Sequence, residues 1–436
     1  MLHVDKADSL QFEPVNITAD GLLPFRIYKI LLKMHHVDGD YNSYCTVESN
    51  GNGTIDLANS QPLRGTYVGA DPMGLFLSLR ASETVRYGSI AKIDVTKPSY
   101  YTLILSNASG NVIDEIHLRK YWMHPLVTRI EVSQNGLHGA LFKPPGDGPF
   151  SCILDVPGAD GNLSELSAAM LASEGFVVFT FAYYAYKKDL PKTIPEVDVE
   201  FFDKPVEFAR NLPYCSGKMG LIGGCFGGTV AFFLATRFTQ FAAMVSINSL
   251  EAFCKEDHVM KENGKLMNAE EIDIGLTRFT NTIMSQKLCF DNLFEKLTPE
   301  TSIPWRKTPK TTAFRLVGSL DNMVMNASSA CNNIRRHLSE NGNQVEMELV
   351  PAGHSLRQPY FPHHSWIYKK YYKANWGFGG ECFTHSKSQE IVWKNNIAFL
   401  KRYLGNPQKD HHTVPTIPFD FQRTMDFPFR KVCFLT

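Results

Sequence analysis

Residues 219–236 read MGLIGGCFGGTVAFFLAT, and this stretch decides the fold of the chain. Its apolar beginning, Met219 to Ile222, is typical of a buried strand, and its end, Thr229 to Thr236, is typical of a helix. The two runs are joined by Gly-Gly-Cys-Phe-Gly-Gly at 223–228. This order of strand, Gly-x-nucleophile-x-Gly and helix is that of a nucleophile elbow, a sharp turn that presents a catalytic side chain.

The elbow predicts Cys225 as a nucleophile. The backbone of such a turn is strained, and Gly223 and Gly227 remove the side chains that would collide there. A thiolate at a helix N-terminus is stabilised by the helix dipole and by free N–H groups, and the backbone N–H of Phe226 is placed to receive an oxyanion. The alternative is that Cys225 is a small apolar core residue in a glycine-rich turn.

A nucleophile of this kind needs a base and an acid that orients the base, and in such domains they follow in the order nucleophile, acid, histidine. Asp321 lies just past one predicted strand, Ala313 to Val317, and His354 lies just past another, Val345 to Val350. We therefore expect His354 as the base and Asp321 as its orienting acid. The alternatives are a helix N-cap for Asp321 and an ordinary loop histidine for His354.

The second donor for an oxyanion is expected in the turn after the first parallel strand of the domain core. That turn reads Pro-Gly-Ala-Asp-Gly at 157–161, so the backbone of Gly158 or Ala159 is the candidate. An ordinary glycine turn is the alternative.

Strands and helices alternate from Ser151 onward, which predicts an α/β domain with a mostly parallel sheet and helices on both faces. Strands are expected at Cys152–Val156, Phe176–Phe181, Met219–Ile222, Ala242–Ile247, Ala313–Val317 and Val345–Val350. Helices are expected at Ser164–Ser173, Val199–Asn211, Thr229–Thr236, Ala327–Ser339 and Gln389–Tyr403. The polar stretch 254–310 is too long for a plain connection, so we expect a partly helical insertion or lid there.

The first 123 residues have a different texture, with short apolar runs of period two such as Ile30 and Leu32 against Lys29 and Lys33. Turn signals separate about seven such runs, and no helix of ten or more residues is expected. This pattern predicts an antiparallel β-sandwich. The domain limits we expect are 1–125 for the sandwich, 126–405 for the α/β domain with its insertion, and 406–436 for a C-terminal extension.

The composition of the chain excludes several classes of partner and location. The 44 basic residues balance the 44 acidic residues, which argues against a protein that coats nucleic acid or an anionic membrane. No apolar stretch reaches the ~20 residues of a membrane span, and the N-terminus lacks the apolar core of a signal peptide. Nine scattered cysteines without a Cys-x-x-Cys pair indicate reduced thiols and no metal site. We therefore expect a cytoplasmic protein.

The chain resembles the family of acyl-CoA thioesterases and bile acid-CoA:amino acid N-acyltransferase, over about residues 12–404. The resemblance implies an Ig-like β-sandwich followed by an α/β-hydrolase domain, with a triad of Cys225, Asp321 and His354. Most thioesterases of the family have Ser at the elbow, whereas the N-acyltransferase has Cys, as here. The matching segments are Gly65–Tyr67, Asp71–Leu75, Phe142–Gly146, Gly175–Phe176, Ala182–Tyr186, Asp189–Pro191, the elbow, Val317–Gly318, Gly353–His354 and Pro359–Pro362.

The expected function is that of an enzyme that takes acyl-CoA through an acyl-cysteine intermediate. Water would then release the free acid, or an amine such as glycine or taurine would take the acyl group, and the sequence leaves both outcomes open. Cysteine favours transfer, because a thioester is a better partner for amines than an oxoester is. The alternatives are a dienelactone-hydrolase-like esterase, which the Gly-x-Cys-x-Gly-Gly turn also resembles, and a catalytically silent binding module.

No cofactor is expected beyond coenzyme A as part of the substrate. Lys187, Lys188 and Lys192 follow a strand end on the catalytic side and are weak candidates for the CoA phosphates, with a solvated surface as the alternative. Some family members reside in peroxisomes, but 434–436 read Phe-Leu-Thr and lack the peroxisomal tripeptide.

Overall fold

The structure is a computed structural model that describes residues 1–85, 93–255, 258–291, 293–356, 358–369, 373–407 and 414–415. These residues form two compact units. Unit 1 holds Met1–His124 and also Pro359–His364, and unit 2 holds Pro125–Gln358 and continues from Ser365. The expected C-terminal extension, 406–436, lies for the most part outside the described residues.

Unit 1 consists of two sheets and one short helix, α1 (Gly74–Leu77). Its strands are β1 (Leu2–Val4), β2 (Asp8–Leu10), β3 (Ile17–Ala19), β4 (Ile27–His35), β5 (Tyr41–Glu48), β6 (Ile55–Asp56), β7 (Arg64–Gly65), β8 (Arg80–Ala81), β9 (Ser99–Asn107) and β10 (Val112–Tyr121). The smaller sheet has the order β1-β3-β6, and the larger has the order β2-β10-β9-β4-β5-β7 with β8 also paired to β5. Only the β2–β10 pair is parallel among the described strands of this unit.

The strands of unit 1 follow from the alternation of apolar and polar residues in the sequence. Along β5 every second residue is buried, as the period-two pattern predicts for a strand with one face on a core. Ile30 and Leu32 of β4 are fully buried, whereas Lys29, which precedes Ile30 on the same strand, is exposed to solvent. The predicted antiparallel β-sandwich is therefore confirmed for the N-terminal domain.

Unit 2 is built on an eight-stranded sheet with the order β11-β12-β14-β13-β15-β16-β21-β22. Its strands are β11 (Thr128–Gln134), β12 (Leu137–Lys143), β13 (Phe150–Val156), β14 (Val177–Ala182), β15 (Cys215–Gly224), β16 (Phe241–Ile247), β21 (Ala313–Ser319) and β22 (Val345–Val350). The six strands from β14 to β22 are parallel, and β12 runs antiparallel to β14. This is the α/β-hydrolase fold, as expected.

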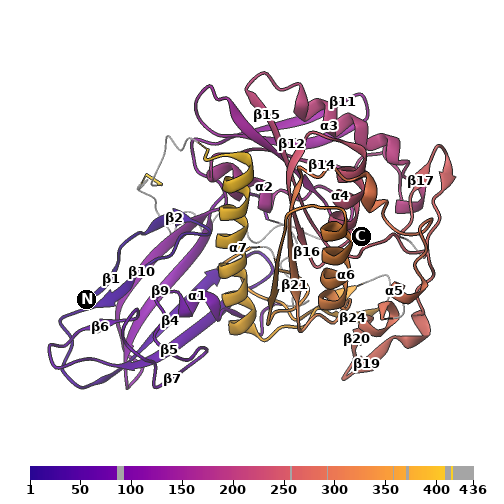
Figure 1. The fold of residues 1–436 in the computed structure, drawn as a ribbon. Coiled ribbons are helices and arrows are strands. Elements are labelled where there is room, and N and C mark those ends of the chain that lie inside the picture. The colour runs from indigo at the N-terminus through magenta and orange to yellow at the C-terminus, as the bar shows by residue number, and fades with distance from the viewer. Residues whose placement is uncertain are drawn as a thin grey trace. The chain divides into compact units, whose positions relative to one another are not determined.

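Five helices cover this sheet (Figure 1): α2 (Leu166–Ser173), α3 (Asp203–Arg210), α4 (Phe226–Arg237), α6 (Ala327–Glu340) and α7 (Cys382–Leu404). Side chains of α3, α4 and α6 share one buried cluster with the residues of one sheet face, among them Leu154 and Phe179. Figure 1 shows α7 on the other side of the sheet, where Lys401 of α7 forms an ion pair with Glu174 at the end of α2. Because both faces are covered, the central strands are buried along their length without alternation and are mostly apolar.

The stretch 254–310 is less helical than expected. Its described residues form short strands and single helical turns, with one four-residue helix, α5 (Leu293–Lys296). Two of its strands, β19 (Arg278–Thr280) and β20 (Ile283–Ser285), join β23 (Trp366–Lys369) and β24 (Ala374–Gly377) in a second sheet with the order β19-β20-β24-β23. The sequence did not predict β23 and β24. This sheet links the insertion to the chain that follows His354.

No helix within the described ranges is long and apolar enough to cross a membrane.

One acidic residue lies deep in unit 2 shortly after β16. Glu251 is 2% exposed, and its Oε2 atom has no hydrogen-bond partner among the residues that the structure describes. Burial raises the pKa of this carboxyl from 4.5 to about 8, and the charge of Arg336 opposes the shift only in part. The folded state therefore binds this proton more tightly than the unfolded state does.

We predict that Glu251 makes the protein less stable as the pH rises. The raised pKa contributes to the free energy of unfolding. This contribution is fully present below pH 4.5, the ordinary pKa of the group, and it is lost as the pH rises through the folded-state pKa of about 8. Glu251→Gln should flatten this slope and gain on the order of 2 kcal/mol in the free energy of unfolding near pH 8. Chemical denaturation across this range checks it, with the exposed Glu271→Gln as the control. Equal slopes for wild type and Glu251→Gln would contradict the assignment.

Candidate active site

Cys225 lies on the turn between β15 and α4 in a strained backbone conformation. Its φ of 53° and ψ of −132° are values that a residue with a side chain rarely adopts. The thiol is partly exposed, and the residue directly precedes the first turn of α4, whose N–H groups have no partner within the helix. The predicted strand, sharp turn and helix are thus all present around Cys225.

The glycines of the turn are required by close contacts. A Cβ atom on Gly223 would lie 2.5 Å from the carbonyl oxygen of Gly227, and one on Gly227 would lie 2.3 Å from that of Val156. A Cβ atom on Gly228 would lie 1.8 Å from Oγ of Ser249. The elbow is therefore packed directly against the end of β13, and no larger residue fits at these positions.

We predict that Gly227→Ala destabilises the protein by about 1–3 kcal/mol and removes activity, because the backbone carbonyls it would meet cannot retreat. Thermal unfolding measures the first effect. Gly158→Ala is the matched control for stability, since its Cβ would meet only Gly224 O at an ordinary 3.5 Å. A Gly227→Ala protein as stable as the control would show that the elbow is not tightly packed.

The candidate oxyanion donors lie at the start of α4 and in the turn after β13. Phe226 is the first residue of α4, so its N–H is free of helical bonding. Gly158 and Ala159 are partly buried in the turn after β13, and Tyr183 Oη donates to the carbonyls of Pro157 at 3.2 Å and Gly158 at 3.4 Å. These hydrogen bonds hold the carbonyl groups of Pro157 and Gly158 in place.

His354 follows β22 and is held from three directions. Its backbone N–H donates to the carbonyl of Phe378 at 2.7 Å, and its own carbonyl accepts from Nδ2 of Asn248 at 2.7 Å. Its ring atom Nδ1 lies 3.1 Å from Nδ2 of Asn322. Burial lowers the pKa of the ring to about 4, against the attraction of Asp160 and together with the repulsion of Lys369. The imidazole is therefore neutral near pH 7.

Asn248 joins the ends of three strands around the site and was not predicted. It lies just after β16, is buried, and donates from Nδ2 to Ser319 Oγ at 2.9 Å as well as to His354. Its Oδ1 accepts from the backbone N–H of Ser319 at 2.8 Å. The preceding residue, Ile247, accepts the backbone N–H of Cys225 at 2.9 Å. Cys225 and His354 are thereby tied to one edge of the sheet.

The side chain of Asp321, which was expected to orient the His354 ring, has another hydrogen-bond partner in this structure, and the triad stays a prediction. Its side chain is exposed, and its Oδ2 accepts the backbone N–H of Gly380 at 2.8 Å. The next residue, Asn322, is buried and faces His354 instead. Two adjacent residues on this turn thus have different side-chain partners, and the backbone N–H of Asp321 donates to the carbonyl of Ala352 at 3.0 Å.

An apolar cluster borders the thiol on the insertion side. Cys225 packs against it, and Ile272 and Leu276 of the insertion are among its partly buried members. Its buried members are Leu250, Cys254, Cys289, Phe290, Leu293, Met325 and Ala327. The insertion therefore contributes apolar side chains next to the candidate nucleophile.

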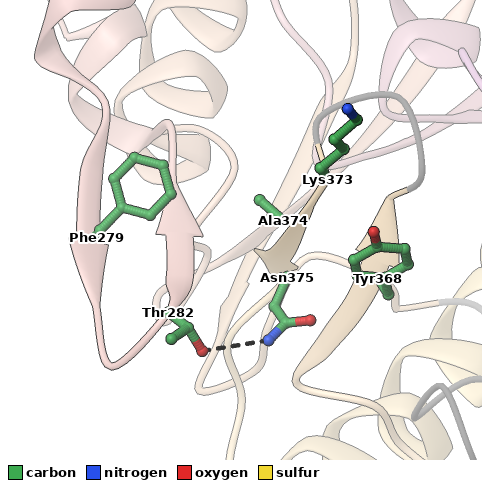
Figure 2. Close-up of a pocket in the computed structure, with 6 residues that line it drawn as sticks. All are labelled: Phe279, Thr282, Tyr368, Lys373, Ala374 and Asn375. Carbon is green, nitrogen blue, oxygen red and sulfur yellow. Dashed lines mark hydrogen bonds between the residues drawn. The ribbon is translucent and has the colours of Figure 1, made fainter.

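A separate surface pocket of about 310 Å³ lies on the second sheet of unit 2. Figure 2 shows the rings of Phe279 and Tyr368 on either side of Ala374 and Asn375, with Thr282 and Lys373 completing the lining. Nδ2 of Asn375 donates to Oγ1 of Thr282 at 3.3 Å. None of these residues was predicted from the sequence.

The three candidate lysines lie on the loop after β14. Lys187, Lys188 and Lys192 are exposed, and Nζ of Lys187 lies 5.0 Å from the centre of the Tyr186 ring. Asp189, between them in sequence, pairs with His138 at 2.8 Å. Among the residues that the structure describes, no group of acidic, histidine and cysteine side chains could hold a metal ion.

Two family descriptions match this chain. The acyl-CoA thioester hydrolase/BAAT N-terminal region matches residues 12–134, and the BAAT/acyl-CoA thioester hydrolase C-terminal region matches residues 197–406. A bile acid-CoA:amino acid N-acyltransferase of Mus musculus is 30% identical over 90% of this chain and 95% of its own. The chain belongs to the acyl-CoA thioester hydrolase/BAAT family.

Other relatives in this family carry both kinds of name. Acyl-coenzyme A amino acid N-acyltransferase 1 of Mus musculus is 28% identical over 91% of this chain and 96% of its own. Acyl-coenzyme A thioesterase 1 of Rattus norvegicus is 29% identical over 93% of this chain and 96% of its own. Among solved structures, an esterase from Pyrococcus furiosus has 15% identity over 64% of this chain and 93% of its own, with a TM-score of 0.40. The relatives favour neither the dienelactone hydrolase nor the silent binding module.

Proposed function

We propose that this protein processes acyl-CoA thioesters through an acyl-cysteine on Cys225. The observation that carries the proposal is the backbone of Cys225, with its positive φ at the start of α4, in a chain that belongs to this family. Relatives of both names act, by those names, on CoA thioesters of acyl or bile acid groups. The apolar cluster that Cys225 packs against supports an acyl substrate, because it makes one side of the thiol's surroundings apolar.

In the first half-reaction the elbow supplies the nucleophile, His354 is the proposed base, and the backbone at the start of α4 and in the turn after β13 supplies the oxyanion donors. The Cys225 thiolate, favoured by the N-terminus of α4, forms a bond to the thioester carbonyl carbon, and the bond from that carbon to the CoA sulfur breaks. Coenzyme A leaves as a thiolate and takes a proton from solvent. The N–H groups of Phe226 and of Gly158 or Ala159 receive the transient oxyanion.

The second half-reaction decides the product. Attack by water on the acyl-cysteine gives a free acid, and attack by the amine of glycine or taurine gives an amide; either regenerates the Cys225 thiol. Cysteine favours the amine, because a thioester reacts more readily with amines, relative to water, than an oxoester does. His354 is the imidazole at this edge of the sheet and is the group available for proton handling in this step.

We predict that Cys225→Ala abolishes CoA release while the fold persists, because the change removes one sulfur atom from a partly exposed position. Release of CoA from palmitoyl-CoA is measured with a thiol reagent, and circular dichroism checks the fold. Mass spectrometry of quenched wild type should show one acyl adduct, on Cys225. The buried Cys331→Ala protein is the control and should keep full activity. An adduct on another cysteine would exclude Cys225.

Cys225→Ser tests the preference for amines. Serine keeps a nucleophile at the same point, but its hydroxyl depends on a base for deprotonation, so acylation should slow. The acyl-serine is an oxoester and yields less readily to amines. The ratio of amide to free acid at saturating glycine or taurine should therefore fall at least severalfold. An unchanged, nonzero ratio would contradict the role assigned to cysteine, and a wild type that makes no amide would mark the protein as a thioesterase.

A further inference from the structure

His385 is a fully buried histidine in the first turn of α7, and it contacts the loop that carries His354. Both of its ring nitrogens bond to the main chain of that loop. Nδ1 lies 2.9 Å from the backbone nitrogen of Gly353, and Nε2 lies 2.9 Å from the carbonyl oxygen of Ser355. Gly353 and Ser355 directly precede and follow His354, so one side chain spans the main chain on both sides of the candidate base.

These two contacts determine where the His385 ring carries its proton. A backbone N–H can only donate, so Nδ1 accepts from Gly353, and the proton of the neutral ring resides on Nε2, which donates to Ser355. Turning the ring over would place C–H groups at both positions and take this partner from the buried N–H of Gly353. A protonated ring would turn Nδ1–H toward that N–H, and the first turn of a helix also disfavours positive charge. The contacts therefore specify a neutral ring with its proton on Nε2.

Two further contacts hold the same loop. Gln389 lies four residues after His385, on the same face of α7, and donates from Nε2 to the carbonyl of Ser355 at 3.4 Å. A Cβ atom on Gly353 would lie 2.1 Å from the carbonyl oxygen of Gly379, so the main chain is in close contact there as well. The loop is thus bonded to α7 at both ends, and it cannot shift without losing a buried hydrogen bond.

We propose that His385 is a positioning residue that holds the main chain around His354 and so fixes the place of that imidazole relative to Cys225; its effect on catalysis rests on the proposed function. A base works only within hydrogen-bond reach of the proton that it takes. A misplacement of about 1 Å can cost about a hundredfold in rate. Loss of His385 therefore displaces the His354 ring without changing the chemistry of the ring.

The first test reads the contacts directly and needs no substrate. Protein labelled with ¹⁵N in histidine is studied by long-range ¹H–¹⁵N NMR, in which the chemical shift distinguishes a nitrogen that bears a proton from a bare one. The His385→Phe and His354→Gln proteins identify the two sets of signals. We expect the proton of His385 on Nε2 in wild type, and we expect the His354 signals to move in His385→Phe. A proton on Nδ1 of His385, or unmoved His354 signals, would overturn the proposal.

The second test measures acylation of Cys225 by palmitoyl-CoA in a single turnover. His385→Phe keeps an aromatic ring in the same space but loses both bonds, whereas His385→Asn keeps an oxygen that can accept from Gly353. At saturating palmitoyl-CoA we expect acylation to be about 10–100-fold slower in His385→Phe and within about fivefold of wild type in His385→Asn. The half-saturating concentration should change by less than about twofold, because the thioester still binds. A His385→Phe protein that acylates as fast as wild type would exclude the positioning role.

Asn396→Ala is the matched control for stability alone. Asn396 is also buried on α7, and its Oδ1 accepts from Nε of Arg315 at 2.7 Å, so its loss weakens the same helix at a bond that does not involve residues 353–355. We expect this variant to unfold at a lower temperature, as His385→Phe does, but to acylate Cys225 at the wild-type rate. Equal losses of rate in the two variants would show that His385 has only a structural role, and would overturn the proposal.

The double variant His354→Gln with His385→Phe tests whether His385 acts through His354. A positioning residue has nothing left to position once the imidazole is gone, so the second change should cost less than about twofold in the rate of acylation. A further loss as large as that seen with His354 present would contradict the proposal. A wild type that forms no acyl-cysteine on Cys225 would overturn the proposed function, and the NMR signals would still decide whether His385 positions His354.

Discussion

The close approach of three backbone segments at the elbow is the constraint on which the rest of the site depends. Gly227 lies against the carbonyl of Val156, and Gly223 lies against the carbonyl of Gly227, with no room for a side chain at either position. This packing holds Cys225 at a positive φ and at the same time places the turn after β13 beside it. The nucleophile, the start of α4 and the turn after β13 are therefore positioned together by these backbone contacts.

Much of this arrangement is predictable from the sequence because it follows from local patterns. Strands that are buried on both faces read as apolar runs, and each of the six parallel strands was predicted within a few residues of its observed limits. The elbow is a short, contiguous motif. The ends of β21 and β22 carry polar residues at one edge of the sheet, so the neighbourhood of His354 could be predicted as well.

The side-chain partners near His354 could not be predicted in the same way. Asp321 and Asn322 are adjacent, and spacing along a chain does not tell which partner each of two neighbours on a turn binds. Those partners are distant in sequence, Gly380 for Asp321 and His354 for Asn322. Strands β23 and β24 were missed for a related reason. Each has four residues, too few for a periodic pattern, and β24 is paired with β20, which lies some ninety residues earlier.

The four-stranded sheet of β19, β20, β24 and β23 limits how this protein can be divided into modules. It is made of two segments that lie far apart in the sequence, and one of them provides the carbonyl of Phe378 that holds His354. The insertion and the chain after His354 therefore form one structural unit. A chimera that takes residues 254–310 from a relative would have to take residues 366–378 as well. Otherwise β24 of this protein would have to pair with a β20 whose side chains did not evolve to pack beside it.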